Sequence, residues 1–273
     1  MLGIMRVPFI KMHGLGNDFA ILDGREIDLP RLSDAQVRAL ADRHRGIGFD
    51  QLILLSPSRE ADMTMRIHNA DGGEVEACGN ATRAVAVLHG APASIQTTGG
   101  VLQVRPADGA AEVAMGRPRF GWEEIPLAYA MDTRDMPLGW DMLERPGAAN
   151  VGNPHVVFFI DDVDAVPLDR LGPEIEIDAL FPERINVNVA QVVSRDAIRL
   201  RVWERGAGLT LACGTGACAT AAVAYRRGLV DAEVSVTLPG GTLTIRHDED
   251  GGIHMSGPAT ESYRGTFELD DFT

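Results

Sequence analysis

The sequence predicts an α/β (α+β) fold of two pseudo-symmetric lobes from a tandem duplication, each a strand-rich, barrel-like sheet around a central helix. Three observations predict it. Residues 63–88 match residues 198–223 at an offset of 135, and such internal repeats indicate two copies of one unit. In both copies, alternating apolar residues lead to a cysteine, a glycine and a run of small residues. Further matches lie on either side, in the same order in both halves.

The strands are expected where apolar residues alternate. Residues 63–67 and 198–202 place an apolar side chain at every second position, which is the pattern of a half-buried strand. Further along, GGVLQVR in the first copy matches GGTLTIR in the second, and both alternate again. Near the start of each half, Gly16-Asn17 matches Gly152-Asn153. Turn-marked strands therefore outnumber helices in both copies.

Three helices are expected. The small-residue runs Ala81–Leu88 and Ala217–Tyr225 contain no glycine or proline, so each is predicted to be a buried helix that begins just after its cysteine. An amphipathic helix is expected at Ser33–His44, with Ser33 as its N-cap and Leu40 on its apolar face.

The lobe boundary is expected near Gly121–Glu124, after the last strand of the first copy around Val113–Met115. We therefore predict a first lobe over residues 1–122 and a second lobe over residues 123–263. Residues 264–273 are expected to return to the first lobe.

Charge and apolar patterning exclude several classes of protein. The chain has 25 basic and 39 acidic residues, a net charge of −14 and no basic cluster, so it would repel a phosphate backbone and we expect no nucleic-acid partner. No apolar run approaches the roughly 18 residues of a membrane helix, and Arg6, Pro8 and Lys11 interrupt the place of a secretory signal. Three cysteines are too few for a disulfide framework. A cytoplasmic protein without a membrane partner is expected.

No cofactor and no metal are expected either. Lys11 is the only lysine among the 25 basic residues, so a pyridoxal Schiff base could form only there. A G-x-x-x-x-G-K-[ST] phosphate loop is absent. A zinc site made of Cys213, Cys218 and His155 would lack the usual C-x2-4-C spacing and a fourth ligand.

Cys78 and Cys213 lie at equivalent positions, each at a strand-to-helix turn beside a glycine. Two copies around a pseudo-dyad would turn both helix N-termini toward one cleft, where they would lower the pKa of each thiol. One thiolate could then remove a proton from a carbon while the other thiol returns one to the opposite face, which inverts the stereochemistry. Buried structural cysteines are the alternative, but the matched positions favour the paired bases. Cys218 would face away from the site and serve packing.

Seven motifs carry a family resemblance that runs nearly end to end. They are KMHGLGNDF (11–19), RHRGIGFDQ (43–51), NADG (69–72), ACGNATR (77–83), GNPH (152–155), PERIN (182–186) and ERGAGLTLACGTGA (204–217). On these motifs the chain resembles the diaminopimelate epimerases. The resemblance implies a homodimer of two-lobed chains that interconverts LL- and meso-2,6-diaminopimelate without a cofactor, in lysine and peptidoglycan precursor biosynthesis.

The resemblance also implies the site residues. Cys78 and Cys213 match the two catalytic cysteines. Gly79-Asn80 and Gly214-Thr215 would offer backbone N–H groups to the reacting carboxylate, which stabilises the charge that develops there. The other substrate-binding residues would be Asn17, Gln51, Asn69, Asn153, Asn186, Glu204 and Arg205, with Asn69, Asn186 and Arg205 at the distal carboxylate and ammonium. His155 and Glu204 match the pair that modulates the pKa of the thiols by moving protons.

The chain departs from the family pattern at two places. It reads CGNATR where CGNGAR is usual, and it has Asn188 and Val189 where an acidic or aromatic residue is expected. Proline and hydroxyproline racemases also pair cysteines, and phenazine-type isomerases share the fold without the pair. A proline racemase has no use for a second charged end, so the residues expected at the distal end favour diaminopimelate. A regulatory disulfide between Cys78 and Cys213 would make a thiol redox switch, which no C-x-x-C supports.

Overall fold

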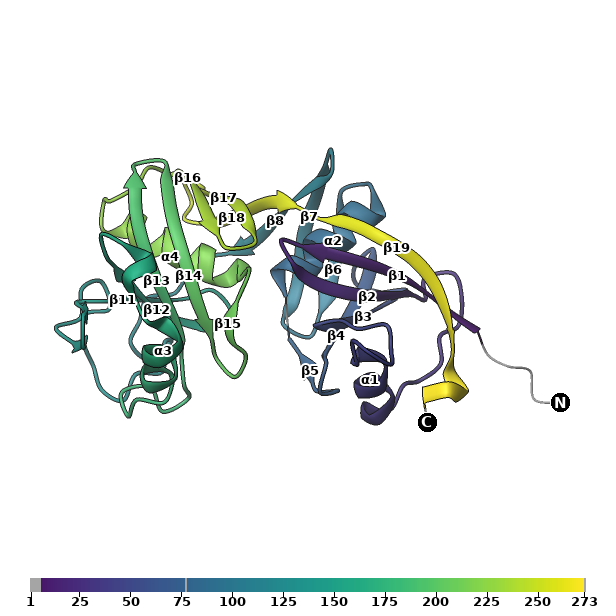
Figure 1. The fold of residues 1–273 in the computed structure, drawn as a ribbon. Coiled ribbons are helices and arrows are strands. Elements are labelled where there is room, and N and C mark those ends of the chain that lie inside the picture. Colours follow the sequence, from purple (N-terminus) through teal and green to yellow (C-terminus); the bar gives the residue numbers. More distant parts are fainter. Residues whose placement is uncertain (1–5, 77, 273) are drawn as a thin grey trace. The chain divides into compact units, whose positions relative to one another are not determined.

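The computed structural model describes residues 6–76 and 78–272, and the chain divides into two units (Figure 1). Unit 1 contains the chain up to Val113 and from Pro258 onward, and unit 2 is Ala114–Gly257. Each unit has one central helix with strands around it, as the sequence predicts.

The elements of unit 1 follow one another along the first half of the chain, and a last strand returns from the C-terminal end. They are β1 (Arg6–Gly14), β2 (Asn17–Asp23), α1 (Asp34–Ala41), β3 (Gln51–Ser56), β4 (Met63–Asn69), β5 (Glu74–Val75), α2 (Gly79–His89), β6 (Ala93–Thr97), β7 (Gly100–Ala107), β8 (Ala110–Gly116), β19 (Thr260–Glu268) and the 3-10 helix η2 (Leu269–Phe272). The pairs β1–β2, β3–β4, β6–β7 and β7–β8 are antiparallel, whereas β2–β3 and β4–β6 are parallel.

The elements of unit 2 repeat this order. They are β9 (Gly139–Trp140), β10 (Leu143–Glu144), β11 (Gly147–Asn150), β12 (Pro154–Phe159), the 3-10 helix η1 (Val163–Ala165), α3 (Leu168–Glu176), β13 (Asn186–Ser194), β14 (Ala197–Glu204), β15 (Gly208–Thr210), α4 (Gly214–Arg226), β16 (Glu233–Leu238), β17 (Gly241–His247) and β18 (Ile253–Pro258). The pairs β11–β12, β13–β14, β16–β17 and β17–β18 are antiparallel, whereas β12–β13 and β14–β16 are parallel.

The two units therefore share one topology. Parallel neighbours need a crossover connection, and each unit has two: the first contains α1 or α3, and the second contains α2 or α4. A short strand pairs antiparallel with the strand that precedes each central helix: β5 pairs with β4 in unit 1, and β15 pairs with β14 in unit 2. The predicted duplication and the predicted fold class are confirmed.

The two central helices are rich in small residues because strands approach them closely. α2 contacts β1, β7 and β19, and α4 contacts β11, β12, β13, β16 and β17. In α4 every residue from Gly216 to Ala224 is buried, and most of them are alanine. A helix that is covered by strands in this way needs no polar face.

The unit boundaries differ from the expected ones. Unit 1 ends after Val113 rather than at residue 122, and Arg119 instead exchanges backbone hydrogen bonds with Asn150 of β11. The returning segment begins at Pro258 rather than at residue 264. The reason is that β19 pairs with β1 along its whole length, so the complete strand belongs to unit 1.

The helix expected at Ser33–His44 is present as α1 and ends earlier. Ser33 caps it, and Gln36 completes a capping box, which satisfies N–H groups at both positions. The helix ends at Ala41 because the Asp42 carboxylate accepts hydrogen bonds from the backbone N–H groups of His44 and Arg45, which turns the chain. Leu40 is fully buried, as expected for the apolar face.

The corresponding helix of unit 2, α3, was not expected from the sequence, because Gly172 and Pro173 lie inside it. Leu171 and Ile175 nevertheless pack into the core of unit 2 with Phe158 and other apolar residues. Gly172 is required there, since a Cβ at this position would lie 2.5 Å from the ring of Trp203.

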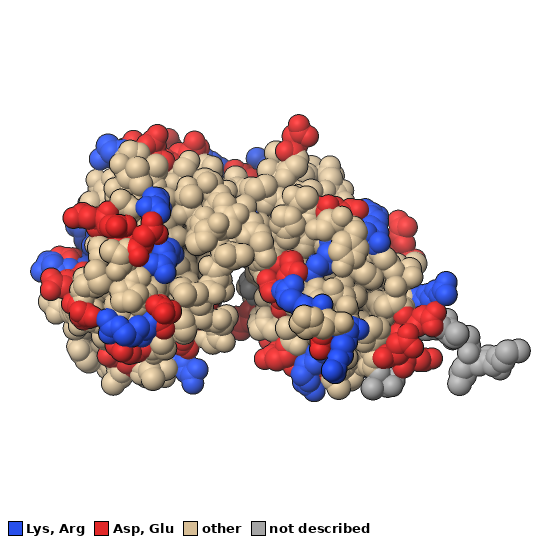
Figure 2. Space-filling view, viewed as in Figure 1, with Lys and Arg blue, Asp and Glu red and all other residues tan. Residues whose placement is uncertain are grey.

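Acidic and basic side chains are interspersed on the face drawn in Figure 2. On the face drawn in Figure 2, the described residues form no continuous basic area, and several arginines pair with carboxylates, for example Arg66 with Glu74 at 2.7 Å. Within the described ranges, no helix is long and apolar enough to cross a membrane. The same residues contain no group of three or more His, Cys, Asp or Glu side chains arranged to hold a metal ion.

Candidate active site

Each central helix begins directly after one of the two predicted catalytic cysteines. Cys78 is the N-cap residue of α2 and Cys213 is the N-cap residue of α4, and both have extended backbone. The helix starts therefore lie where the repeat predicts them. The thiols differ in exposure, since Cys78 is half-buried whereas Cys213 is buried.

In unit 1, Asn17 connects the thiol of Cys78 to a line of polar side chains. The Cys78 Sγ lies 3.8 Å from Oδ1 of Asn17, and Nδ2 of Asn80 donates to the same oxygen at 3.1 Å. Asn17 in turn donates through Nδ2 to Asp50 at 2.9 Å. The buried Arg83 donates to Oδ1 of Asn80 at 2.9 Å. Because a guanidinium only donates, this contact sets which way the Asn80 amide faces.

Gln51 and Asn69 form a second polar pair in unit 1. They are register partners on β3 and β4, and Nε2 of Gln51 donates to Oδ1 of Asn69 at 3.1 Å. Asp50, which accepts from Asn17, directly precedes Gln51. The structure thus brings the predicted residues of unit 1 to neighbouring ends of β2, β3 and α2.

An ion-pair network missed by the sequence reasoning supports this region. Asp18, next to Asn17, pairs with Lys11 at 2.5 Å and with Arg43 at 2.8 Å, and Arg43 also pairs with Asp50 at 2.6 Å. The two cations hold the pKa of Asp18 well below its usual range, although burial acts in the opposite direction. All four residues belong to the motifs KMHGLGNDF and RHRGIGFDQ, which was the available signal. Lys11, the single lysine of the chain, is thus part of an ion-pair network within unit 1.

In unit 2, Cys213 lies in a short network of donors and one carboxylate. The backbone N–H of Gly216 donates to its Sγ at 3.3 Å, and Oγ1 of Thr215 lies 3.5 Å away. Its thiol also hydrogen-bonds Glu204, whose carboxylate accepts from Thr210. The structure thus brings Cys213 together with Glu204, one of the two residues expected to modulate the thiols.

The pKa of Cys213 is shifted in the direction opposite to the expected one. Burial raises the pKa of this thiol well above its ordinary value, and the negative charge of Glu204 raises it further. The hydrogen bonds at the start of α4 act in the expected direction but are outweighed. Burial disfavours a thiolate because it removes water from the charged form, so Cys213 is a thiol at neutral pH.

His155 is fully buried in β12 and is hydrogen-bonded to the side chain of Asn153. Its Nε2 lies 2.9 Å from Oδ1 of Asn153, and its Nδ1 lies 3.0 Å from Nδ2 of Asn188. Burial lowers the pKa of His155 to about 3, and the charge of Arg205 acts in the same direction. The imidazole is therefore neutral at physiological pH.

Asn186 and Arg205 are joined at the ends of β13 and β14. Oδ1 of Asn186 accepts from the backbone N–H of Arg205 at 2.9 Å, and its Nδ2 donates to the Pro154 carbonyl at 2.8 Å. The exposed Arg205 also donates to the carbonyl of Glu183 at 2.9 Å. Sequence reasoning missed Glu176, a buried carboxylate of α3 that accepts from the next N–H, that of Gly206, at 3.1 Å. No sequence motif marks Glu176.

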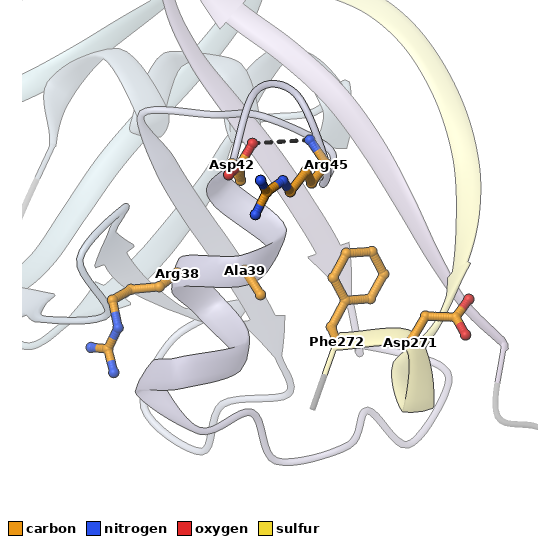
Figure 3. Close-up of a pocket in the computed structure, with 6 residues that line it drawn as sticks. All are labelled: Arg38, Ala39, Asp42, Arg45, Asp271 and Phe272. Carbon is orange, nitrogen blue, oxygen red and sulfur yellow. Dashed lines mark hydrogen bonds between the residues drawn. The ribbon is translucent and has the colours of Figure 1, made fainter.

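Unit 1 also has a pocket beside α1 and the turn that follows it. It has a volume of about 390 Å³ and is lined by Arg38, Ala39, Asp42, Arg45, Asp271 and Phe272. Figure 3 shows Phe272 and Asp271 of η2 beside the residues of α1 and of the turn that follows it. Arg38 is engaged with the Asp71 carbonyl at 2.8 Å, and none of the predicted site residues lines the pocket.

Two solved structures share the duplicated fold of this chain. A phenazine biosynthesis protein from Bacillus anthracis aligns with a TM-score of 0.69 at 16% identity, over 96% of this chain and 99% of that one. A hydroxyproline epimerase from Agrobacterium vitis aligns with a TM-score of 0.69 at 15% identity, over 98% of this chain and 92% of that one. This chain thus belongs to the same fold class as these two proteins, and here each unit contributes one helix-capping cysteine.

Sequence comparison places the chain within this class. The model of the family described as diaminopimelate epimerase matches residues 9–121 and 147–261. A diaminopimelate epimerase of Erythrobacter litoralis is 65% identical over 269 residues, 98% of this chain and 100% of the relative. A diaminopimelate epimerase of Rhizorhabdus wittichii is 62% identical over 98% of both chains. The chain belongs to the diaminopimelate epimerase family.

Proposed function

We propose that this protein interconverts LL- and meso-2,6-diaminopimelate, with Cys78 and Cys213 as the two bases that act on one α-carbon. One observation carries the proposal: both cysteines cap the central helices of two units with the same topology, in a chain that belongs to an epimerase family. Two equivalent thiols are what proton transfer on opposite faces of one carbon requires.

The proton balance of the reaction is simple. A thiolate on one face takes the α-proton and becomes a thiol, and the thiol on the opposite face gives its proton to the carbanion and becomes a thiolate. Backbone N–H groups of Gly79-Asn80 and Gly214-Thr215 would stabilise the charge that develops on the reacting carboxylate. Each turnover exchanges the protonation states of Cys78 and Cys213, and the reverse reaction restores them.

The contact with Glu204 suggests how Cys213 can serve in both directions. As a thiol it is ready to act as the acid, which fits its raised pKa. When it must act as the base, the hydrogen-bonded carboxylate of Glu204 is the acceptor for its proton. Glu204 therefore modulates this thiol, whereas His155 acts as a neutral group that holds Asn153.

The remaining predicted residues would bind the rest of the substrate. Diaminopimelate carries a carboxylate and an ammonium at both ends, so it needs donors and acceptors beyond the reacting carbon. The residues proposed to bind it are Asn17, Gln51, Asn69, Asn153, Asn186, Glu204 and Arg205. The exposed guanidinium of Arg205 fits a carboxylate, and the amides offer both donors and acceptors.

We further propose a cytoplasmic homodimer that needs neither a metal nor pyridoxal phosphate and that serves lysine and peptidoglycan precursor biosynthesis. The resemblance to the family implies the dimer and the pathway. The thiols that the mechanism requires fit a reducing compartment, and none of Cys78, Cys213 and Cys218 forms a disulfide in the part of the chain that the structure describes. Analytical ultracentrifugation tests the dimer, and activity retained in EDTA without added pyridoxal phosphate tests the cofactor proposal.

The decisive experiment is incubation of the enzyme with LL-diaminopimelate in deuterated water. We expect deuterium at the α-carbon together with formation of the meso isomer, because the returned proton comes from a thiol that has exchanged with solvent. L-Proline and trans-4-hydroxy-L-proline serve as controls and should remain undeuterated. Deuteration of either control, or none with diaminopimelate, would contradict the proposed substrate.

A further inference from the structure

A line of three side chains connects the core of unit 2 to the predicted substrate-binding residue Asn153. Asn188 is fully buried in β13. Its Nδ2 lies 2.9 Å from the Val156 carbonyl and 3.0 Å from Nδ1 of His155. His155 in turn reaches Oδ1 of Asn153 through Nε2, at 2.9 Å.

The contact with Val156 determines the direction of every hydrogen bond in this line. A backbone carbonyl only accepts, so the amide atom of Asn188 that faces it must be the NH2 group. Its second hydrogen then points to Nδ1 of His155, which must be the unprotonated nitrogen of a neutral imidazole. Nε2 therefore carries the proton and donates it to Asn153. Because Oδ1 of Asn153 accepts this bond, its amide nitrogen is the group that it can offer to a ligand.

The first copy of the repeat shows that the fold does not require these polar groups. Strand register makes Phe19 the equivalent of His155, and Ile53 the equivalent of Asn188. All four side chains are fully buried. Burying an amide and an imidazole costs free energy unless their hydrogen bonds are satisfied, and apolar residues fill the same places in unit 1. A role in the site is therefore the better explanation of the polar pair.

Asn188 also contacts the start of the helix that follows Cys213. A Cβ at Gly216 would lie 2.8 Å from Oδ1 of Asn188 and 3.2 Å from Sγ of Cys213. Among the described residues, none hydrogen-bonds this Oδ1. One amide thus packs against the first turn of α4 on one side and orients His155 on the other.

We propose that Asn188 is a positioning residue of this active site: through His155, it presents the Asn153 side chain as a hydrogen-bond donor to a carboxylate oxygen of the substrate. The proposal rests on the proposed function, in which Asn153 binds substrate. Under this proposal Asn188, one of the residues at which the chain departs from the family pattern, has a function in the site.

The test compares Asn188→Asp with the wild-type enzyme. A carboxylate against Nδ1 holds the imidazole proton on that nitrogen, so at a pH where the ring is neutral Nε2 becomes the acceptor and Asn153 must turn its oxygen outward. We expect 15N-resolved NMR of His155, assigned with a His155→Phe variant, to show Nε2–H in the wild type and Nδ1–H in Asn188→Asp. We expect kcat/KM for diaminopimelate to fall at least tenfold.

Asn188→Ile, which installs the residue of the first copy, should abolish the preference for a single tautomer. Thr220→Val is the matched control, since it removes a buried hydroxyl of α4 that has no hydrogen-bond partner among the described residues. It should leave both the spectrum and kcat/KM unchanged. An Nδ1–H tautomer in the wild type, or an Nε2–H tautomer and unchanged kcat/KM in Asn188→Asp, would overturn the proposal. A wild-type enzyme inactive on diaminopimelate would refute the proposed function. The NMR spectra would still show whether Asn188 sets the tautomer of His155.

Discussion

At the scale of single residues, the two cysteines occupy equivalent positions in different surroundings. Cys78 is half-buried and faces an amide oxygen of Asn17, whereas Cys213 is buried and hydrogen-bonded to Glu204. The repeat places the neutral Asn69 where the second copy has Glu204. The carboxylate that hydrogen-bonds Cys213 therefore has no acidic counterpart at the equivalent position of the first copy.

This environment predicts how Cys213 reacts with iodoacetamide. Because the pKa of the thiol is raised, its alkylation should be slow at pH 8 and should accelerate only above the ordinary titration range of a thiol. Glu204→Gln removes the charge that raises the pKa, so alkylation at pH 8 should be about tenfold faster for each pKa unit lost. Peptide mapping by mass spectrometry measures the rate at each cysteine.

Glu249→Gln is the matched control, since it removes one exposed carboxylate from the same unit. The alkylation rate of Cys213 should be the same in this variant as in the wild type. An unchanged pH profile of Cys213 in Glu204→Gln would mean that burial alone sets the pKa.

At the scale of elements, the two central helices begin with the same Cys-Gly pair but tolerate different residues after it. The third helical residue of α4 is Gly216, and the repeat places Ala81 at the same position of α2. In α4 a Cβ would lie 2.8 Å from Asn188 and 3.1 Å from Val202. In unit 2, Asn188 therefore leaves no room for alanine at position 216, whereas unit 1 has alanine at the equivalent position, Ala81.

Gly216→Ala should consequently damage both stability and activity. A methyl group at this point forces Asn188 or Cys213 to move, and overpacking of this kind costs about 1–3 kcal/mol. We expect the free energy of unfolding, measured with urea, to fall by that amount and kcat to fall at least tenfold. The reverse change in the other helix, Ala81→Gly, should cost no more than about 1 kcal/mol of helix propensity and leave kcat within a few-fold.

At the scale of the whole molecule, one chain supplies the same structural unit twice, and the proposed reaction needs both. Each unit holds one of the two proposed catalytic thiols together with its own polar residues: Asn17, Gln51 and Asn69 in unit 1, and Asn153, Asn186 and Arg205 in unit 2. In the proposed reaction, the need for a base on each face of the substrate carbon would be the chemical reason for keeping two copies.

We therefore expect Cys78→Ala and Cys213→Ala each to abolish epimerisation while the protein stays folded. A single base cannot both remove a proton from one face and return one to the other. Cys218→Ala is the control: this cysteine is buried within α4, and a small change in size there should leave turnover nearly unchanged. Circular dichroism checks the fold, and near-normal turnover in either catalytic variant would contradict the two-base mechanism.

The sequence by itself determined the features that depend on spacing along the chain. The repeat, the starts of α2 and α4 after Cys78 and Cys213, and the Ser33 cap of α1 could all be predicted, because each is encoded by neighbouring residues. The family motifs marked Asn17 as a substrate-binding residue and Glu204 as a residue that modulates the thiols. In the structure Asn17 lies beside Cys78, and Glu204 hydrogen-bonds Cys213.

Only the tertiary structure decided the features that depend on burial and on contacts between distant segments. The pairing of β19 with β1 joins the two ends of the chain and moves the unit boundaries away from those expected. Burial and the Glu204 charge outweigh the helix N-terminus at Cys213 and reverse the expected direction of its pKa. Asn188 reaches His155 from a strand more than 30 residues away, so no local pattern could show that the buried imidazole is neutral and which nitrogen carries its proton.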